Sequence, residues 1–141
     1  MIRKQWYIVL ETKEVPKDRP MGVTRMGEKL VFWRDTHGSV HCMGDRCPHM
    51  NAPLHMGTVK NDCIACPFHG FEYDETGQCT YLPSLGSAGT PPKVLKAKTY
   101  PVYENHGFIW IWWGENPPAG LKPPRWFESL SADFVYTTVK D

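Results

Sequence analysis

Short apolar runs separated by turn signals make up most of the chain, and no long segment has the spacing of an amphipathic helix. The runs WYIVLE (6–11) and KLVFWRD (29–35) are rich in aromatic and β-branched residues, which is typical of strands. The turn THG (36–38) before SVHCM (39–43) predicts a hairpin. Two more hairpins are predicted over 71–82 and 99–114, with turns at 74–77 and 104–107. The pattern therefore predicts an all-β domain.

Two segments outside these hairpins are predicted to be irregular. The stretch PSLGSAGTPPKVLK (83–96) has the composition of a loop. The stretch GENPPAGLKPPRWF (114–127) is Pro-rich and predicts an extended arm. The last ten residues, ADFVYTTVKD, resemble the start of another strand, so we expect a truncated further domain to begin within 115–141.

Length and charge exclude several classes of protein. A chain of 141 residues is long enough for one domain with its own core. Its 16 basic and 15 acidic residues give a net charge of +1, without the basic surface that nucleic acid or an anionic membrane requires. The longest apolar run, FIWIWW (108–113), is far shorter than the roughly 20 residues of a membrane helix. The N-terminus lacks the features of a signal peptide, so we expect a cytoplasmic protein with no membrane partner.

Candidate ligands concentrate in CPHMNAPLHMGTVKNDCIACPFHG (47–70). Cys47 and His49 form C-x-H, and sixteen residues later Cys66 and His69 form C-x2-H. Reduced thiols in a cytosol indicate metal binding rather than disulfides, and five cysteines cannot all pair. Three hypotheses remain: a structural zinc site, a thiolate site that includes Cys63, or two matched loops that share a two-iron cluster.

Cys63 lies in DCIAC, which is predicted to be a strand leading into the second loop. Side chains alternate along a strand, so Ile64 and Cys66 share one face while Cys63 shares the other with Ala65. We therefore expect Cys63 to be a small packing residue and not a ligand. Cys42 and Cys79 also fall in predicted strands, and we expect them to pack as small hydrophobes.

The spacing C-x-H, sixteen residues, C-x2-H, with CPH and CPFHG at its ends, resembles the signature of Rieske [2Fe–2S] domains. The resemblance implies a Rieske fold, in which antiparallel sheets pack together and two loops form a small cluster-binding lobe, here about 43–82. It also implies that Cys47 and Cys66 bind one iron while His49 and His69 bind the other. Histidines in place of two cysteines raise the reduction potential above that of plant-type ferredoxins.

The residues beside the four ligands have expected roles of their own. Pro48 and Pro67 fix φ directly after each cysteine and stiffen the loops. Gly70 permits a tight bend and a close backbone approach to the cluster. The resemblance places Tyr73 where the family has a tyrosine that donates to a ligand cysteine.

Two stabilising devices of respiratory Rieske subunits are missing. The resemblance places their loop-clamping disulfide at Asn51 and Phe68, and their serine donor at Phe71. Without these contacts the reduced form is less stable. We therefore expect a potential toward the lower end of the roughly −150 to +300 mV range of Rieske centres.

Almost the whole chain resembles the N-terminal domain of Rieske non-haem iron oxygenases. The stretches QWYIVLETKEVP, DRCPHMNAPLHMG, CPFHGFEYDETGQC, YENHGFIWIWWGE and PPRWF carry the likeness. It implies a Rieske domain over 1–114, followed by the arm and a catalytic domain with mononuclear iron beyond Asp141. A reductase or ferredoxin would supply electrons, and the full-length protein could form a homotrimer. No catalytic residue is expected in this chain.

Two other functions stay open at the level of sequence. The first is a stand-alone Rieske ferredoxin, although ferredoxins of this class end near residue 114. The second is a zinc-stabilised binding module. The remaining histidines are expected to make surface or polar contacts: His37, His41, His55 and His106. Three tryptophans are expected to form core with one exposed edge: Trp110, Trp112 and Trp113.

Overall fold

The computed structural model describes residues 2–124, so the strand predicted within 132–141 and the end of the arm lie outside the described residues. The first sheet, in the order β1-β11-β10, consists of β1 (Gln5–Glu11), β10 (Val102–Asn105) and β11 (Phe108–Trp113). The second, in the order β2-β3-β4-β9, consists of β2 (Met21–Arg25), β3 (Glu28–Arg34), β4 (Val40–Gly44) and β9 (Thr99–Tyr100). The third, in the order β5-β6-β7-β8, consists of β5 (Thr58–Lys60), β6 (Cys63–Ala65), β7 (Glu72–Tyr73) and β8 (Cys79–Tyr81).

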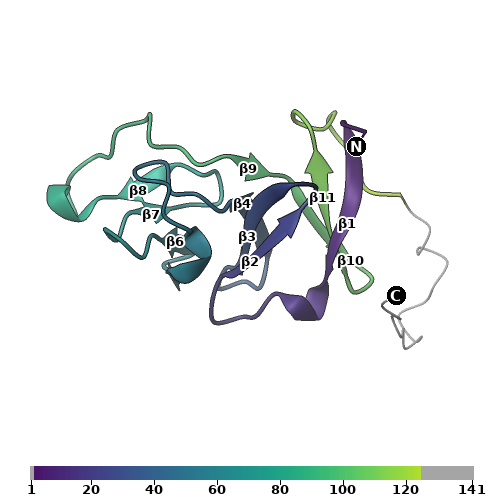
Figure 1. Ribbon diagram of the computed structural model, residues 1–141, viewed down its shortest axis with the longest axis horizontal. Coiled ribbons are helices and arrows are strands. Elements are labelled where there is room, and N and C mark those ends of the chain that lie inside the picture. The colour runs from purple at the N-terminus through teal and green to yellow at the C-terminus, as the bar shows by residue number, and fades with distance from the viewer. Residues whose placement is uncertain (1, 125–141) are drawn as a thin grey trace.

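All neighbouring strands are antiparallel, and the three predicted hairpins are confirmed as β3–β4, β7–β8 and β10–β11. Three single-turn 3-10 helices connect strands: η1 (Thr12–Glu14), η2 (Leu54–Met56) and η3 (Pro83–Leu85). The third sheet lies at one end of the elongated molecule and the first sheet at the other, with the second between them (Figure 1). The predicted fold class, packed antiparallel sheets with a small lobe, is confirmed. Within 2–124, no helix has the length and apolar character to cross a membrane.

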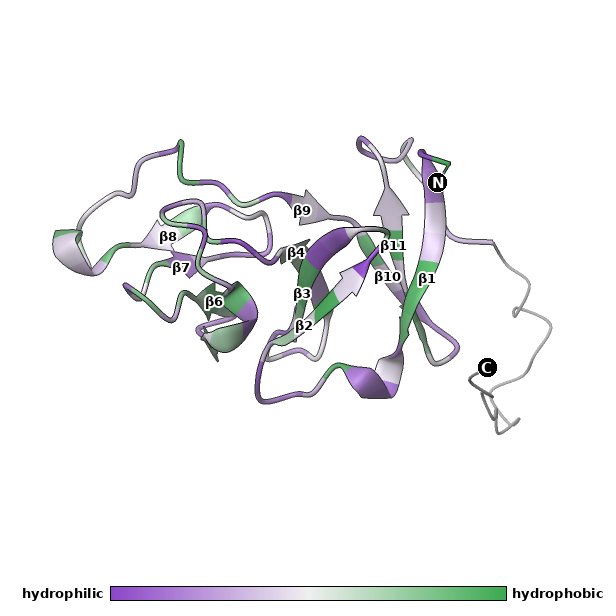
Figure 2. Cartoon of the chain, viewed as in Figure 1, coloured by the Kyte–Doolittle hydropathy of each residue, from purple (hydrophilic) through white to green (hydrophobic). Residues whose placement is uncertain are grey.

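The middle of strand β3, within the second sheet, is buried on both faces. Leu30 and Phe32 of β3 pack into one hydrophobic cluster, whereas Val31 and Trp33 pack into another, and none of the four side chains is exposed. Successive side chains of a strand point to opposite faces, so a strand with two covered faces needs an unbroken apolar run. Figure 2 shows this hydrophobic stretch in β3.

Two clusters therefore flank the central sheet. The base core joins it to the first sheet and consists of Val9, Leu10, Val15, Leu30, Phe32, Val40, Cys42, Tyr100, Ile109, Ile111 and Trp113. The lobe core joins it to the loops and the third sheet and consists of Val31, Trp33, Met43, Cys47, Ala52, Leu54, Ile64, Cys66, Phe71, Tyr73, Cys79 and Ala97.

The turn between β5 and β6 fastens the third sheet to the central one. Asn61 and Asp62 both have positive φ, 49° and 62°, as a tight type I′ hairpin requires. The Asp62 carboxylate accepts a 2.7 Å hydrogen bond from the Thr36 amide. The Asp62 carbonyl accepts one of 3.3 Å from the Trp33 indole. Both donors belong to the β3–β4 hairpin, so this turn ties the two sheets together.

A buried arginine links the first sheet to the second. Arg34, at the end of β3, donates to the carbonyl oxygens of Val15, Gly38 and Thr12 at distances of 3.1, 2.8 and 2.9 Å. Its guanidinium also lies 3.0 Å from the Glu104 carboxylate in β10. The guanidinium group thus supplies hydrogen bonds to three carbonyl oxygens that lie outside the strands, and the Glu104 carboxylate balances its charge.

Asp35 organises the β3–β4 turn. Its carboxylate accepts 2.9 Å hydrogen bonds from the amides of His37 and Ser39 and lies 2.8 Å from Nε2 of His41. Burial acts to raise the pKa of Asp35, but the His41 ring and the two amides outweigh it and hold that pKa below its ordinary value. His41 therefore makes a polar contact, as expected.

The prediction of an exposed tryptophan edge is wrong. Trp110, Trp112 and Trp113 are only 4%, 3% and 9% exposed. Trp6 of β1 packs edge-on against Trp112, with ring centroids 5.7 Å apart. The Trp6 indole also donates to the Leu121 carbonyl in the arm, at 3.2 Å. The described part of the arm therefore contacts this sheet at Leu121.

Candidate iron–sulfur centre

The first cysteine loop closes on itself through two backbone hydrogen bonds. The Cys47 amide donates to the Ala52 carbonyl, and the Asn51 amide donates back to the Cys47 carbonyl, both at 2.8 Å. Asn51 adopts a φ of 57°, in the left-handed region that asparagine tolerates better than most residues. The resulting turn places the Cys47 side chain in the lobe core, 1% exposed.

The second loop repeats this pattern at the same sequence offsets. The Cys66 amide donates to the Phe71 carbonyl at 2.8 Å, and the Gly70 amide donates to the Cys66 carbonyl at 3.0 Å. Gly70 has a φ of 69° and occupies the position that Asn51 has in the first loop. The two loops therefore share one backbone design, which brings two buried cysteines into the same core.

The four predicted ligands come together, with sulfur inside and imidazole outside. Cys66 is 4% exposed, whereas His49 and His69 are exposed. The two imidazole rings meet edge to face, with centroids 5.0 Å apart. Burial raises the pKa of the Cys66 thiol, and a hydrogen bond with the Cys47 side chain raises it further. Both cysteine side chains pack in the lobe core.

Hydrogen-bond donors surround the sulfurs. The amide N–H groups of Phe68 and His69 donate to the Cys66 sulfur and act to lower its pKa. The Tyr73 hydroxyl lies 3.2 Å from the Cys47 sulfur. Burial raises the pKa of Tyr73, and the Cys47 contact adds to that effect, so the phenol keeps its proton and can donate. Tyr73 thus has the contact that the family resemblance implies.

The side-chain arrangement fits a two-iron cluster better than a single metal ion. Within residues 2–124, His, Cys, Asp and Glu side chains nowhere gather in a group of three or more suited to one ion. A structural zinc ion needs four ligands around one point. A Rieske cluster needs only two ligands on each iron, which is how the cysteine pair and the histidine pair are arranged.

Ring contacts and exposed apolar side chains surround the histidines. Phe71 stacks on His49, with centroids 4.5 Å apart and planes 23° apart. Phe68 and Met50 are 66% and 61% exposed. Pro48 is half-buried and Pro67 is exposed. The two prolines that follow the cysteines therefore differ in how exposed they are to solvent.

The remaining cysteines follow the predicted strand alternation. Ile64 is fully buried, while Cys63 is half-buried on the opposite face of β6, with its sulfur 3.6 Å from the Thr80 hydroxyl. Cys63 therefore contacts Thr80 on the partly exposed face of the third sheet and does not pack into the core. Cys42 and Cys79 are buried as expected, and none of the five cysteines forms a disulfide.

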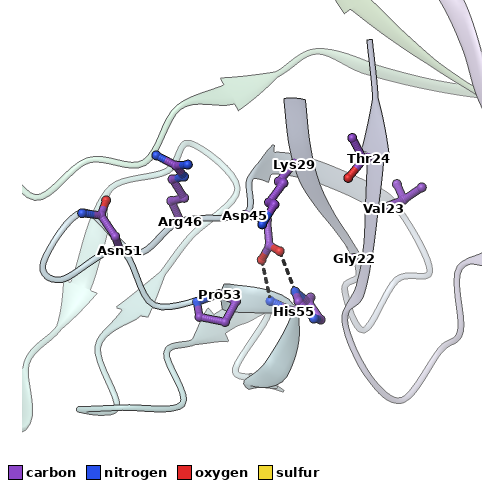
Figure 3. A pocket seen from close by; sticks show the side chains of 9 residues that line it. All are labelled: Gly22, Val23, Thr24, Lys29, Asp45, Arg46, Asn51, Pro53 and His55. Atoms are coloured by element: carbon purple, nitrogen blue, oxygen red, sulfur yellow. Dashed lines mark hydrogen bonds and ion pairs between the residues drawn. The ribbon is translucent and has the colours of Figure 1, made fainter. Parts of the chain in front are cut away.

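Sequence reasoning missed one polar pair beside the first loop. The Asp45 carboxylate is 5% exposed, accepts a 2.8 Å hydrogen bond from the His55 amide and lies 2.5 Å from Nδ1 of its ring (Figure 3). The pair joins the two ends of the loop that contains Cys47. The ring lies against β2, where a Cβ atom on Gly22 would come within 2.5 Å of it. The spacing of ten residues gave no signal for this contact.

Comparison with known proteins agrees with this geometry. The family model of the Rieske [2Fe–2S] domain matches residues 5–101. The chain therefore belongs to the Rieske [2Fe–2S] domain family, and its cofactor is a Rieske-type [2Fe–2S] cluster.

Similar proteins include oxygenase components and a chloroplast protein. The chain is 37% identical over 122 residues to the iron–sulfur subunit of the toluene-4-sulfonate monooxygenase system of Comamonas testosteroni, covering 86% of this chain and 34% of that protein. It is 33% identical over 128 residues to protein TIC 55 of Arabidopsis thaliana, covering 91% and 24%. A crystal structure of dicamba monooxygenase with non-haem iron and dicamba superposes with a TM-score of 0.77 at 34% identity, covering 89% and 38%. The chain spans about a quarter to two fifths of the length of these proteins.

Proposed function

We propose that the chain carries single electrons through a Rieske cluster, with Cys47 and Cys66 on one iron and His49 and His69 on the other. The observation that carries this proposal is the repeated loop geometry, which buries both sulfurs together and leaves both imidazoles at the surface. When bound, the cluster supplies a site that gains and loses one electron.

The protein would contribute a dry, pre-formed surrounding for that site. The lobe core keeps water from the cysteine sulfurs, and Tyr73 with the amides of Phe68 and His69 donates toward them. Such donors stabilise added negative charge and so adjust the reduction potential. Pro48, Pro67 and the left-handed Gly70 would hold the two loops in shape. The exposed imidazoles would provide the route by which electrons enter or leave.

We further propose that the chain is the N-terminal Rieske domain of an oxygenase component. Residues 1–114 would form the domain, with the lobe at about 43–82, and residues 115–141 would lead toward a catalytic domain with mononuclear non-haem iron. The kinship with oxygenase components over 80% or more of this chain supports this assignment. A reductase or ferredoxin would donate electrons, and full-length subunits would form a homotrimer. A stand-alone ferredoxin is the second candidate.

Reconstitution tests the cluster and its ligands. Iron and acid-labile sulfide should reach two of each per chain, and the reduced protein should show a Rieske EPR spectrum. His69→Cys should lower the reduction potential or abolish the cluster, because a thiolate adds negative charge to the core. His37→Cys, in the exposed β3–β4 turn, is the matched control and should leave the spectrum unchanged. Stoichiometric zinc without sulfide, or an unchanged potential in His69→Cys, would contradict the assignment.

The extent of the natural gene separates the two electron-transfer candidates. A reading frame that continues past codon 141 into a region with two histidines and a carboxylate supports the oxygenase assignment. A stop codon directly after codon 141 supports the ferredoxin.

A further inference from the structure

Two adjoining hollows run beside the first cysteine loop and share four lining residues, Lys29, Asp45, Arg46 and Asn51. We call their combined surface the basic groove. One end is bordered by 22–24 of β2, by Pro53 and by His55, and the other by 27–28 and by 96–98. The groove thus crosses from the central sheet to the loop that leads into β9.

Positive charge in the groove exceeds negative charge. Lys29, Arg46 and Lys96 are exposed, and within 2–124 none of them has a carboxylate within ion-pair distance. Both acids of the lining are already engaged. Asp45 binds His55 as described above, and Glu28 accepts from Lys98 at 3.1 Å and from the Tyr100 hydroxyl. The net charge of the whole chain is only +1, so these three unpaired cations make the groove more positive than the average surface.

The groove adjoins the loop that carries the proposed ligands Cys47 and His49. Arg46 is the residue before Cys47, and both Pro48 and Asn51 line the groove from within the first loop. Figure 3 shows the Asp45 carboxylate turned toward His55, while the Arg46 side chain points the opposite way. The Asp45–His55 pair thus fixes the chain on one side of Arg46 and leaves its guanidinium free to meet a partner.

We propose that the basic groove is the docking site for an acidic protein that donates electrons to the cluster; this rests on the proposed electron-transfer function. Complementary charge steers protein encounters and raises association rates by about 10- to 1,000-fold at low ionic strength. One electron passes from the reduced donor to the oxidised cluster, and no bond forms or breaks. Nucleic acid fits the groove less well, because its described lining offers no tryptophan, tyrosine or phenylalanine on which bases could stack.

The test is anaerobic stopped-flow reduction of the cluster-loaded chain by a reduced, strongly acidic plant-type [2Fe–2S] ferredoxin. Such ferredoxins have potentials near −400 mV, so transfer to a Rieske centre is downhill. The variants are Lys29→Gln/Lys96→Gln and Lys29→Glu/Lys96→Glu. The matched control is Lys17→Glu/Lys122→Glu, which makes the same net charge change at two exposed lysines outside the groove. Arg46 is left intact because it adjoins Cys47.

The wild-type rate constant should fall steeply between low and high salt. The glutamate pair should lower the low-salt rate constant by about tenfold or more, the glutamine pair should give an intermediate value, and the control should change it less than about threefold. The reduction potential, visible spectrum and thermal unfolding midpoint should stay unchanged in every variant. An equal loss of rate constant in the control would show that only net charge matters, and would contradict the docking site. A wild-type rate constant that does not depend on salt would contradict it as well.

The two proposals fail in different ways. If the wild-type chain assembles no Rieske cluster, the proposed function is wrong. If it assembles the cluster and accepts electrons equally fast from the ferredoxin in all variants, only the docking site is wrong. Binding of single-stranded DNA as tightly as the ferredoxin would also contradict the docking site, because the groove would then select partners only by their negative charge.

Discussion

The hydroxyl of Tyr73 offers a direct test of how the lobe adjusts the cluster. Tyr73→Phe removes one oxygen, which lies 3.2 Å from the Cys47 sulfur in a fully buried position. The reduced cluster carries one more negative charge than the oxidised one, so a donated hydrogen bond stabilises the reduced form more. Loss of that bond should therefore lower the reduction potential.

The size of the change follows from the strength of one hydrogen bond. A buried hydrogen bond contributes about 1 kcal/mol net, with more when one partner is charged. A factor of ten corresponds to 1.4 kcal/mol, or 59 mV for a one-electron couple, so about 1 kcal/mol corresponds to about 40 mV. Redox titration followed by EPR or visible spectroscopy measures the potential directly.

Tyr100→Phe is the matched control for this measurement. Tyr100 is also buried, at 5% exposure in the base core, and its hydroxyl donates to Glu28 at the border of the basic groove. That variant should keep the wild-type potential while losing some stability. A potential in Tyr73→Phe that equals or exceeds the wild-type value would refute the reasoning, because the Tyr73 contact would then not favour the reduced state.

Three further predictions concern stability. Arg34→Met should lower the free energy of unfolding, measured by urea denaturation, by about 3 kcal/mol, because three carbonyl groups and a carboxylate lose their partner. A loss below about 1 kcal/mol would contradict the stabilising role of Arg34. Gly77→Ala should destabilise more than Gly38→Ala, because both have a φ near +80° but only the Cβ at Gly77 would lie 2.2 Å from a carbonyl oxygen; equal thermal shifts would contradict this crowding. Asp35→Asn should destabilise the protein at neutral pH. Asp35 has a lowered pKa, so its contribution is present above the ordinary carboxyl pKa of about 3.9 and is lost as pH falls through the lowered value. The gap between variant and wild type should therefore narrow in acid, and a constant gap down to about pH 2 would refute this.

Strongly apolar strands were predictable from sequence, and weakly apolar ones were not. The run at 30–33 identified β3, and short glycine turns identified its hairpin with β4. Strand β2 was missed because its burial alternates only between half-buried and exposed, so its residues carry little apolar signal. Strand β5 was missed for the same reason. Both are edge strands held by pairing to a stronger neighbour, which is tertiary information.

The spacing of the cysteines and histidines indicated which residues are the proposed ligands. The conformation of the two loops could be seen only in the structure. From the sequence, Asn51 is only the position of a missing cysteine, yet its positive φ makes it the counterpart of Gly70. Asparagine's tolerance of left-handed backbone was a usable signal for this role. The pairing of Asp45 with His55 could not be foreseen, because nothing in the intervening residues specifies that the loop returns to its starting point.

The shared strand β3 limits how small a working electron carrier made from this chain can be. Val31, Trp33 and Met43 form one wall of the core that encloses the cysteine pair, and all three lie outside the two loops. A peptide comprising only the loops and the third sheet would expose that interior to water and would lose the indole and amide donors that Asp62 uses. Any miniaturised carrier must therefore retain the β3–β4 hairpin, although that hairpin supplies none of the proposed iron ligands.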